Sequence, residues 1–153
     1  MHNSIAPMTD ALTDPFASQL GYQLRRLSLA VMTDLTDALV PHGLRPAEAT
    51  VLLTIHGNPG ITQSEVGRML AIKRANMAPL VAGFEARGLV SRTAVNGRSQ
   101  ALKLTSEGEA LAAQAFAETR ASEERCFPGM PAAERAQIAQ RLRGLWSALD
   151  RAE

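Results

Sequence analysis

Residues 61–105 constrain the fold most, because they hold two short helices and a hairpin within 45 residues. Thr62 and Glu65 form a capping box, in which each side chain can satisfy a backbone N–H at a helix start. A second helix follows a break near residues 71–72 and stops at Gly88. Two strand-like segments, 89–93 and 99–104, then flank an Asn-Gly pair that is typical of tight hairpin turns. This order predicts a winged helix-turn-helix.

Positive charge is concentrated in the same stretch. From Arg68 to Lys103 the chain has seven basic residues and one acidic residue, a net charge of +6. The whole chain has a net charge of +1, so the remainder sums to −5. This asymmetry indicates that one face of the molecule binds a polyanion.

A long amphipathic helix is predicted before this unit. Asp14 followed by Pro15 is typical of a helix start, because the carboxylate can cap free N–H groups and proline lacks an N–H there. Apolar residues then recur at spacings of three and four until residues 41–43. Residues 1–13 have no such periodicity, so we expect them to form a flexible arm.

Three further helices complete the predicted order. One opens at Pro46, and two follow the hairpin, after Thr105 and from Pro131. The apolar faces of the outer helices are too long for the central unit to cover, so we expect a second copy of the chain to cover them. The predicted fold class is mainly α with a small β-wing. It has a DNA-binding lobe at residues 44–105 and helical dimerisation regions at 14–43 and 106–153.

The sequence also predicts which side chains of the first short helix face the core and where the second short helix begins. Val66, Met69 and Leu70 are predicted to face inward from the first short helix. A proline such as Pro79 destabilises the interior of a helix by ~3 kcal/mol. We therefore expect the second helix of the helix-turn-helix, called the recognition helix below, to begin about a turn before Pro79, near residues 75–76.

Composition and motifs argue against several other classes of protein. With 46% hydrophobic and 20% charged residues the chain is globular, and no apolar run approaches the ~20 residues that cross a membrane. A lone Cys126 agrees with a reducing compartment, and a structural role for it is favoured over a redox role. The sequence has no recognisable arrangement of a Ser or Cys nucleophile with His and a carboxylate. It also has no glycine-rich phosphate loop and no metal-ligand spacing. We therefore expect a cytoplasmic protein that is not an enzyme and has no cofactor or metal.

In several motifs the chain resembles the MarR family of bacterial transcriptional regulators, over residues 14–150. The matching features are the helix at 63–70, the run from Phe84 to Arg92, the wing, and Leu104-Thr105-x-x-Gly108. The resemblance implies a homodimer whose outer helices intertwine, whose fourth helix enters the major groove and whose wing reaches a minor groove. It also implies gene repression that ends when a small, often aromatic and anionic, effector binds between the dimer helices and the lobe. Aromatic acids, phenolic aldehydes and their coenzyme A thioesters are all compatible.

The chain departs from the family pattern at two places. In the wing, Asn96, Gly97 and Arg98 stand where relatives usually carry Asp-x-Arg. Near the start of the recognition helix, this chain has Asn76, Ala78 and Pro79, whereas relatives often carry Ser or Thr and then Thr-Arg. Fewer side chains are thus available to donate hydrogen bonds to bases.

DNA contacts are predicted at the start of the fourth helix and at the wing. Arginine suits guanine edges and asparagine suits adenine edges, while a hairpin-tip arginine suits a narrow minor groove. The predicted DNA-binding residues are Lys73, Arg74, Asn76, Arg98, Arg68 and Arg92. The alternatives are a solvated helix end, a flexible hairpin charge and, for Arg68 and Arg92, ordinary surface charges. A winged-helix module that binds protein instead of DNA is the rival function, and the basic block disfavours it.

Effector contacts are predicted on the first two helices. His42 and His56 flank the second helix, where the resemblance places the effector pocket. Tyr22, Arg25 and Arg26 on the first helix are similar candidates, because an arginine pair can clamp a carboxylate. The alternatives are packed, hydrogen-bonded histidines and a solvated or dimer-contacting arginine pair.

Overall fold

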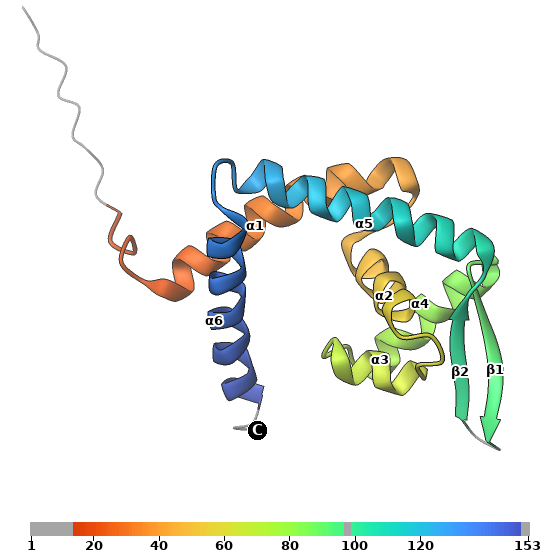
Figure 1. The fold of residues 1–153 in the computed structure, drawn as a ribbon. Helices are drawn as coiled ribbons and strands as arrows, with labels where there is room; N and C mark the ends of the chain where they lie inside the picture. The colour runs from red at the N-terminus through yellow and green to blue at the C-terminus, as the bar shows by residue number, and fades with distance from the viewer. Residues whose placement is uncertain (1–13, 97–98, 151–153) are drawn as a thin grey trace, which may run out of the picture.

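The computed structural model describes residues 14–96 and 99–150, which form a mainly helical chain with a small two-stranded wing (Figure 1). The elements are α1 (Leu20–Leu39), a 3-10 turn η1 (Val40–His42), α2 (Pro46–Gly57), α3 (Gln63–Met69), α4 (Arg74–Ala86), β1 (Val90–Asn96), β2 (Ser99–Leu104), α5 (Ser106–Cys126) and α6 (Ala132–Asp150). The predicted fold class is confirmed. The predicted arm at 1–13 and Arg98 at the wing tip lie outside the described residues.

Two long helices, α1 and α5, lie side by side and form one edge of the molecule (Figure 1). At one end of this pair, α2, α3, α4 and the wing gather into a lobe. At the other end, α6 turns back from the end of α5 and extends apart from the lobe.

The hydrophobic core lies inside the lobe and continues under the near ends of α1 and α5. Its largest fully buried side chains are Phe84, Leu39, Leu52, Ile55 and Met77. They come from the end of α1, from α2 and from α4, and Ala112 and Ala115 of α5 close the same core. The lobe is therefore packed directly onto the two long helices.

The predicted start of the first helix at Asp14 is wrong. Asp14 Oδ1 accepts a hydrogen bond from the Phe16 N–H at 2.9 Å and closes a turn, whereas the helix begins at Leu20. The Phe16 ring packs against Tyr22, with ring centroids 5.3 Å apart. This contact folds residues 14–19 back onto the first turn of the helix, so Asp14 cannot cap it.

Met69 does not face inward as predicted, because 62% of its surface is exposed. The helix α3 ends at Met69, and Ala71 has a φ of 52°, which turns the chain so that Leu70 and Ile72 pack on the core instead. The recognition helix α4 then begins at Arg74, one residue before the predicted range, and accommodates Pro79 in its second turn. Helix ends commonly differ from predictions by this much.

The wing and α5 meet at a tightly packed junction. Gly88 ends α4 with a φ of 68°, and the Leu89 N–H donates to Phe84 O at 2.9 Å. Thr105 Oγ1 donates to Gly88 O at 2.7 Å and accepts from the Gly108 N–H at 3.1 Å, which confirms Thr105 as a helix cap. A Cβ on Gly108 would lie 2.0 Å from Leu89 O. Only glycine therefore fits at this crossing.

The hairpin is also tied to the chain before α3. β1 and β2 pair in antiparallel register from Val90 opposite Leu104 to Ala94 opposite Gln100, with an irregularity before Asn96. On the other edge of β2, the Leu102 N–H donates to Ile61 O at 2.8 Å. The wing thus has a fixed position relative to the helix-turn-helix.

Large apolar side chains remain exposed along the outer helices of the single chain. Trp146, for example, has 53% of its surface exposed. The others are Leu20, Leu24, Leu27, Leu29 and Met32 on α1, Phe116 on α5, and Ile138, Leu145 and Leu149 on α6. Such extensive apolar faces are typical of association surfaces.

One ion pair joins the middle of α1 to the end of α5. Arg125 donates from Nε to Asp34 Oδ1 at 3.0 Å and from Nη2 to Oδ2 at 2.8 Å. Hydrogen bonds from Arg125 and from the buried Ser122 lower the pKa of the Asp34 carboxyl. A lowered folded-state pKa stabilises the fold only above the unfolded-state pKa of about 4, and this contribution is lost as the pH falls further.

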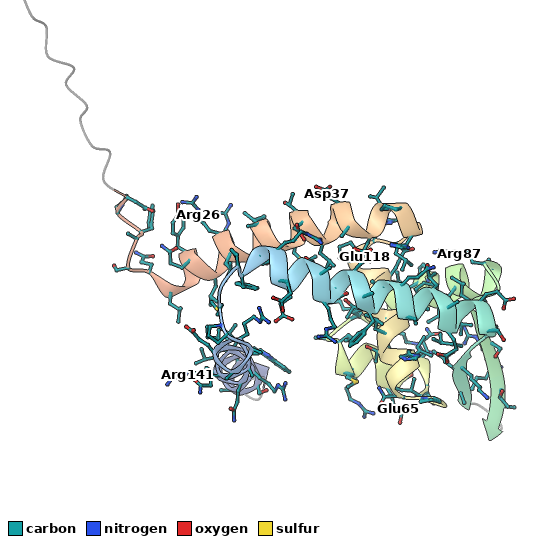
Figure 2. The ribbon with its side chains drawn as sticks, turned by 45° about the horizontal axis from the view of Figure 1, so that its top comes forward. Arg26, Asp37, Glu65, Arg87, Glu118 and Arg141 are labelled. Atoms are coloured by element: carbon teal, nitrogen blue, oxygen red, sulfur yellow. The ribbon has the colours of Figure 1, made fainter. Side chains whose placement is uncertain are left out.

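Replacing Asp34 by Asn is expected to lower the melting temperature at pH 7, and its difference from wild type should shrink as the pH falls from 5 to 2. Thermal unfolding of both proteins across this range measures the effect. Asp37→Asn is the matched control, because Asp37 is exposed on the same helix (Figure 2) and has no ion pair among the described residues. A D34N penalty that stays constant with pH would contradict this role of the carboxylate.

Candidate nucleic-acid interface and ligand cleft

The helix-turn-helix is built by a capped α3 and a well-anchored α4. Glu65 Oε2 accepts from the Thr62 N–H at 2.8 Å, and Thr62 Oγ1 accepts from the Glu65 N–H at 3.3 Å. The hydrogen bonds from Thr62 hold the pKa of the Glu65 carboxyl below its usual value. In α4, Met77, Val81 and Phe84 are buried, so the opposite face of this helix is left to solvent.

The exposed start of α4 carries three of the predicted DNA-binding residues. Lys73 is the N-cap, and Arg74 and Asn76 lie in the first turn, all three exposed. A hollow of about 120 Å³ opens beside them, and Arg68 of α3 and Arg74 both line it. The structure thus brings Arg68 to the same surface as the α4 residues.

Gln63 and Ser64 also line this hollow, and they were not among the residues predicted from the sequence. They occupy the first turn of α3, where backbone N–H groups favour anions. Their place directly after the Thr62 cap was the signal that could have identified them.

The remaining basic residues of the block do not all face this surface. Arg92 donates from Nε to Glu85 Oε1 at 2.7 Å and from Nη2 to Oε2 at 2.9 Å, and Glu85 raises the pKa of the Arg92 guanidinium. Arg87 lies at the far end of α4, beside Gly43 (Figure 2). By contrast, Lys73 and Arg74 have no ion pair within the described part of the chain, and Arg68 has only a coulombic interaction with Glu65.

Both predicted effector histidines contact glutamates of α5. His42 Nε2 lies 3.4 Å from Glu118 Oε1, and His56 Nδ1 lies 2.6 Å from Glu109 Oε2. These contacts tie η1 and α2 to α5. One ring nitrogen of each histidine is therefore occupied by a contact to α5.

The predicted effector residues on α1 lie far from these histidines. Arg26 Cζ lies 5.9 Å from the centre of the Tyr22 ring, near the free end of the helix. At 1.5 Å per residue, the 16 residues from Arg26 to His42 span roughly 24 Å. One chain therefore does not bring Tyr22, Arg25 and Arg26 into a single pocket with His42 and His56.

A cleft of about 420 Å³ opens between the lobe and the long helices. The residues that line it are Leu35 of α1, Pro46, Ala49, Thr50, Leu53 and Thr54 of α2, Asn58, Met69 of α3 and Thr119 of α5. None of the five predicted effector residues is among them. Thr50 and Thr54 lie one helical turn apart, and this spacing was the sequence signal that could have identified them as lining one cleft.

Other possible sites are not supported by the described residues. In residues 14–96 and 99–150, His, Cys, Asp and Glu side chains do not gather in groups of three or more that could hold a metal ion. The described helices include none with the length and apolarity needed to span a bilayer. Cys126 is partly buried at the last residue of α5.

Comparison with known proteins supports a single family. The MarR family sequence profile matches residues 42–99. The structure is similar to the transcriptional repressor CouR bound to a 23-mer DNA duplex, with 33% identity, a TM-score of 0.79, and coverage of 88% of this chain and 97% of that one.

Two ligand-bound structures are also similar. CouR from Rhodococcus jostii RHA1 bound to p-coumaroyl-CoA has 29% identity and a TM-score of 0.79, over 87% of this chain and 95% of that one. A MarR family protein from Mycobacterium tuberculosis in complex with salicylic acid has 30% identity and a TM-score of 0.66, over 82% and 95%. The search of curated proteins gave no match. By fold, sequence and near-complete coverage of these relatives, the chain belongs to the MarR family of winged helix-turn-helix transcriptional regulators.

Proposed function

We propose that this regulator is a repressor that binds a palindromic operator as a homodimer and releases it when a small effector binds. The observation that carries the proposal is the basic surface made by Lys73 and Arg74 at the exposed start of α4 and Arg68 of α3 beside them, of which Lys73 and Arg74 have no ion pair among the described residues. Exposed cations there can neutralise phosphates and reach base edges. The DNA-bound CouR structure supports this assignment.

A second copy of the chain is the proposed partner of the exposed apolar faces of α1 and α6. These faces belong to the helical regions 14–43 and 106–153, outside the lobe at 44–105. A twofold axis through them would present two copies of α4, one for each half-site about one helical turn apart. Arg98 is proposed to reach the minor groove beside each half-site.

The effector is proposed to be a small aromatic compound or an aromatic acyl thioester that binds where the lobe meets the long helices. Support comes from the cleft there and from the relatives bound to p-coumaroyl-CoA and salicylic acid. A ligand releases DNA only if it binds the DNA-incompatible geometry more tightly than the compatible one. We propose that the cleft between α1, α2 and α5 binds the effector more tightly in the DNA-incompatible geometry, in which the two recognition helices lie at a different distance from each other.

The proposal is tested by titrating the protein against duplexes selected from a randomised pool. The expected result is saturable binding with two chains per duplex and an affinity that falls by about 100-fold or more between 50 and 200 mM salt. A duplex with a scrambled site is the control. Failure to select any duplex would instead favour the rival winged-helix module that binds protein.

A further inference from the structure

The cleft between the lobe and the long helices has an uncharged lining. Of its nine lining residues, five are apolar and the others are Thr50, Thr54, Asn58 and Thr119. Lys, Arg and His are not among them, and neither are Asp and Glu. A ligand in this cleft therefore meets apolar surface and four neutral polar side chains.

The three threonine hydroxyls have their hydrogens committed to the protein. Thr50 Oγ1 donates to Pro46 O at 2.9 Å, Thr54 Oγ1 donates to Thr50 O at 2.8 Å, and Thr119 Oγ1 donates to Ala115 O at 2.8 Å. A carbonyl oxygen can only accept, so each hydroxyl hydrogen must point at it. The lone pairs of the three hydroxyl oxygens are then free to accept from a ligand.

Asn58 adds one more acceptor and a single free donor. Its Nδ2 already donates one hydrogen to Thr54 O at 2.9 Å. The cleft as a whole thus offers several acceptors and few donors.

From this arrangement we infer that the cleft selects an uncharged ligand with an apolar body and O–H or N–H groups that donate to Thr50, Thr54 and Thr119. The inference rests on the proposed function. A carboxylate entering the cleft would lose part of its hydration without gaining a cation from the lining of this chain, and it would face acceptor oxygens. A phenol, alcohol or amide instead supplies the hydrogens that the hydroxyl oxygens can accept. The cleft is thereby distinguished from a site built to clamp an anion.

Four related probes test the ligand class. Methyl 4-hydroxybenzoate is neutral with a donor, methyl 4-methoxybenzoate is neutral without one, 4-hydroxybenzoate is anionic with a donor, and 4-methoxybenzoate is anionic without one. Calorimetric titration of the full chain is expected to give at least tenfold tighter binding for methyl 4-hydroxybenzoate than for any of the other three. Equal or tighter binding of an anion, no effect of the hydroxyl, or no binding of any probe would each overturn the inference.

Matched protein variants locate the binding. Thr50→Val, Thr54→Val and Thr119→Val each remove one acceptor and keep the side-chain shape, whereas the corresponding Ser variants keep the oxygen. At least one Val variant should lose methyl 4-hydroxybenzoate affinity by about fivefold, and its Ser counterpart should restore it. Thr33→Val is the control, because Thr33 makes the same bond to Leu29 O, at 2.9 Å, outside the cleft. If all three Val variants bind like wild type, the assigned cleft is wrong.

Operator binding separates this inference from the proposed function. If an anionic compound releases the operator while methyl 4-hydroxybenzoate does not bind, the regulator function stands and the inferred ligand class fails. If methyl 4-hydroxybenzoate binds as expected but leaves operator affinity unchanged, the ligand class stands and ligand-controlled release fails.

Discussion

Replacing Gly108 by Ala is expected to destabilise the fold by about 3 kcal/mol or more, which would lower the melting temperature by roughly 6 °C or more. The added Cβ would lie 2.0 Å from Leu89 O and 3.2 Å from the Leu104 Cβ. Leu89 O cannot move freely, because it accepts from the Thr105 N–H at 3.0 Å. The clash therefore falls on backbone at the root of the wing, where no side-chain rotation can relieve it.

Gly83→Ala is the matched control for this prediction. Gly83 lies inside α4, and a Cβ there would have no neighbour within 4 Å among the described residues. Alanine favours helix over glycine, so this variant should be unchanged or more stable by up to about 1 kcal/mol. Thermal unfolding is compared at one protein concentration, since association shifts the melting temperature. A G108A protein as stable as G83A would disprove the packing described at the wing root.

The double variant Lys73→Ala/Arg74→Ala is expected to weaken operator binding by about 30-fold or more. Each base-edge contact contributes about 1–3 kcal/mol, and a dimer would carry the substitutions in both half-sites. Each lost phosphate contact should also make the dependence of log affinity on log salt shallower by about one. Fluorescence anisotropy with a selected operator at several salt concentrations measures both effects.

Arg87→Ala is the control for the recognition surface. Arg87 belongs to the same basic block but lies at the far end of α4, beside Gly43. Its removal should change operator affinity by no more than about threefold, because only screened long-range attraction is lost. Equal losses for R87A and the double variant would mean that net charge governs binding. The start of α4 would then have no special role.

The fold prediction was accurate in outline because its signals are local. The capping box at Thr62 and the stop at Gly88 depend on residues a few positions apart, and the structure confirms both. The first helix shows the limit of such reasoning. Asp14 and Pro15 form a valid local start signal, but the contact between Phe16 and Tyr22 holds the chain in a turn there.

Charge counting along the sequence also did not reveal how the basic residues are distributed in space. The block from Arg68 to Lys103 carries a net charge of +6, yet Arg92 is bound to Glu85 and Arg87 lies at the other end of α4. A count of residues cannot tell a cation without an ion pair from one that is held by a carboxylate of the same chain. That difference depends on where the helix and the strand place their side chains.

The sequence by itself was enough to predict the order of the helices and the hairpin and the resemblance to the family. It also identified the helix that has a basic, exposed start. Capping, periodicity and turn chemistry act between neighbours along the chain, so they can be read from it. Only the tertiary structure decided the ligand cleft, because Leu35, Thr50 and Thr119 come from three helices that are brought together by packing. The tertiary structure also showed that Met69 is turned outward, next to the left-handed Ala71, and that Gly108 is packed against Leu89.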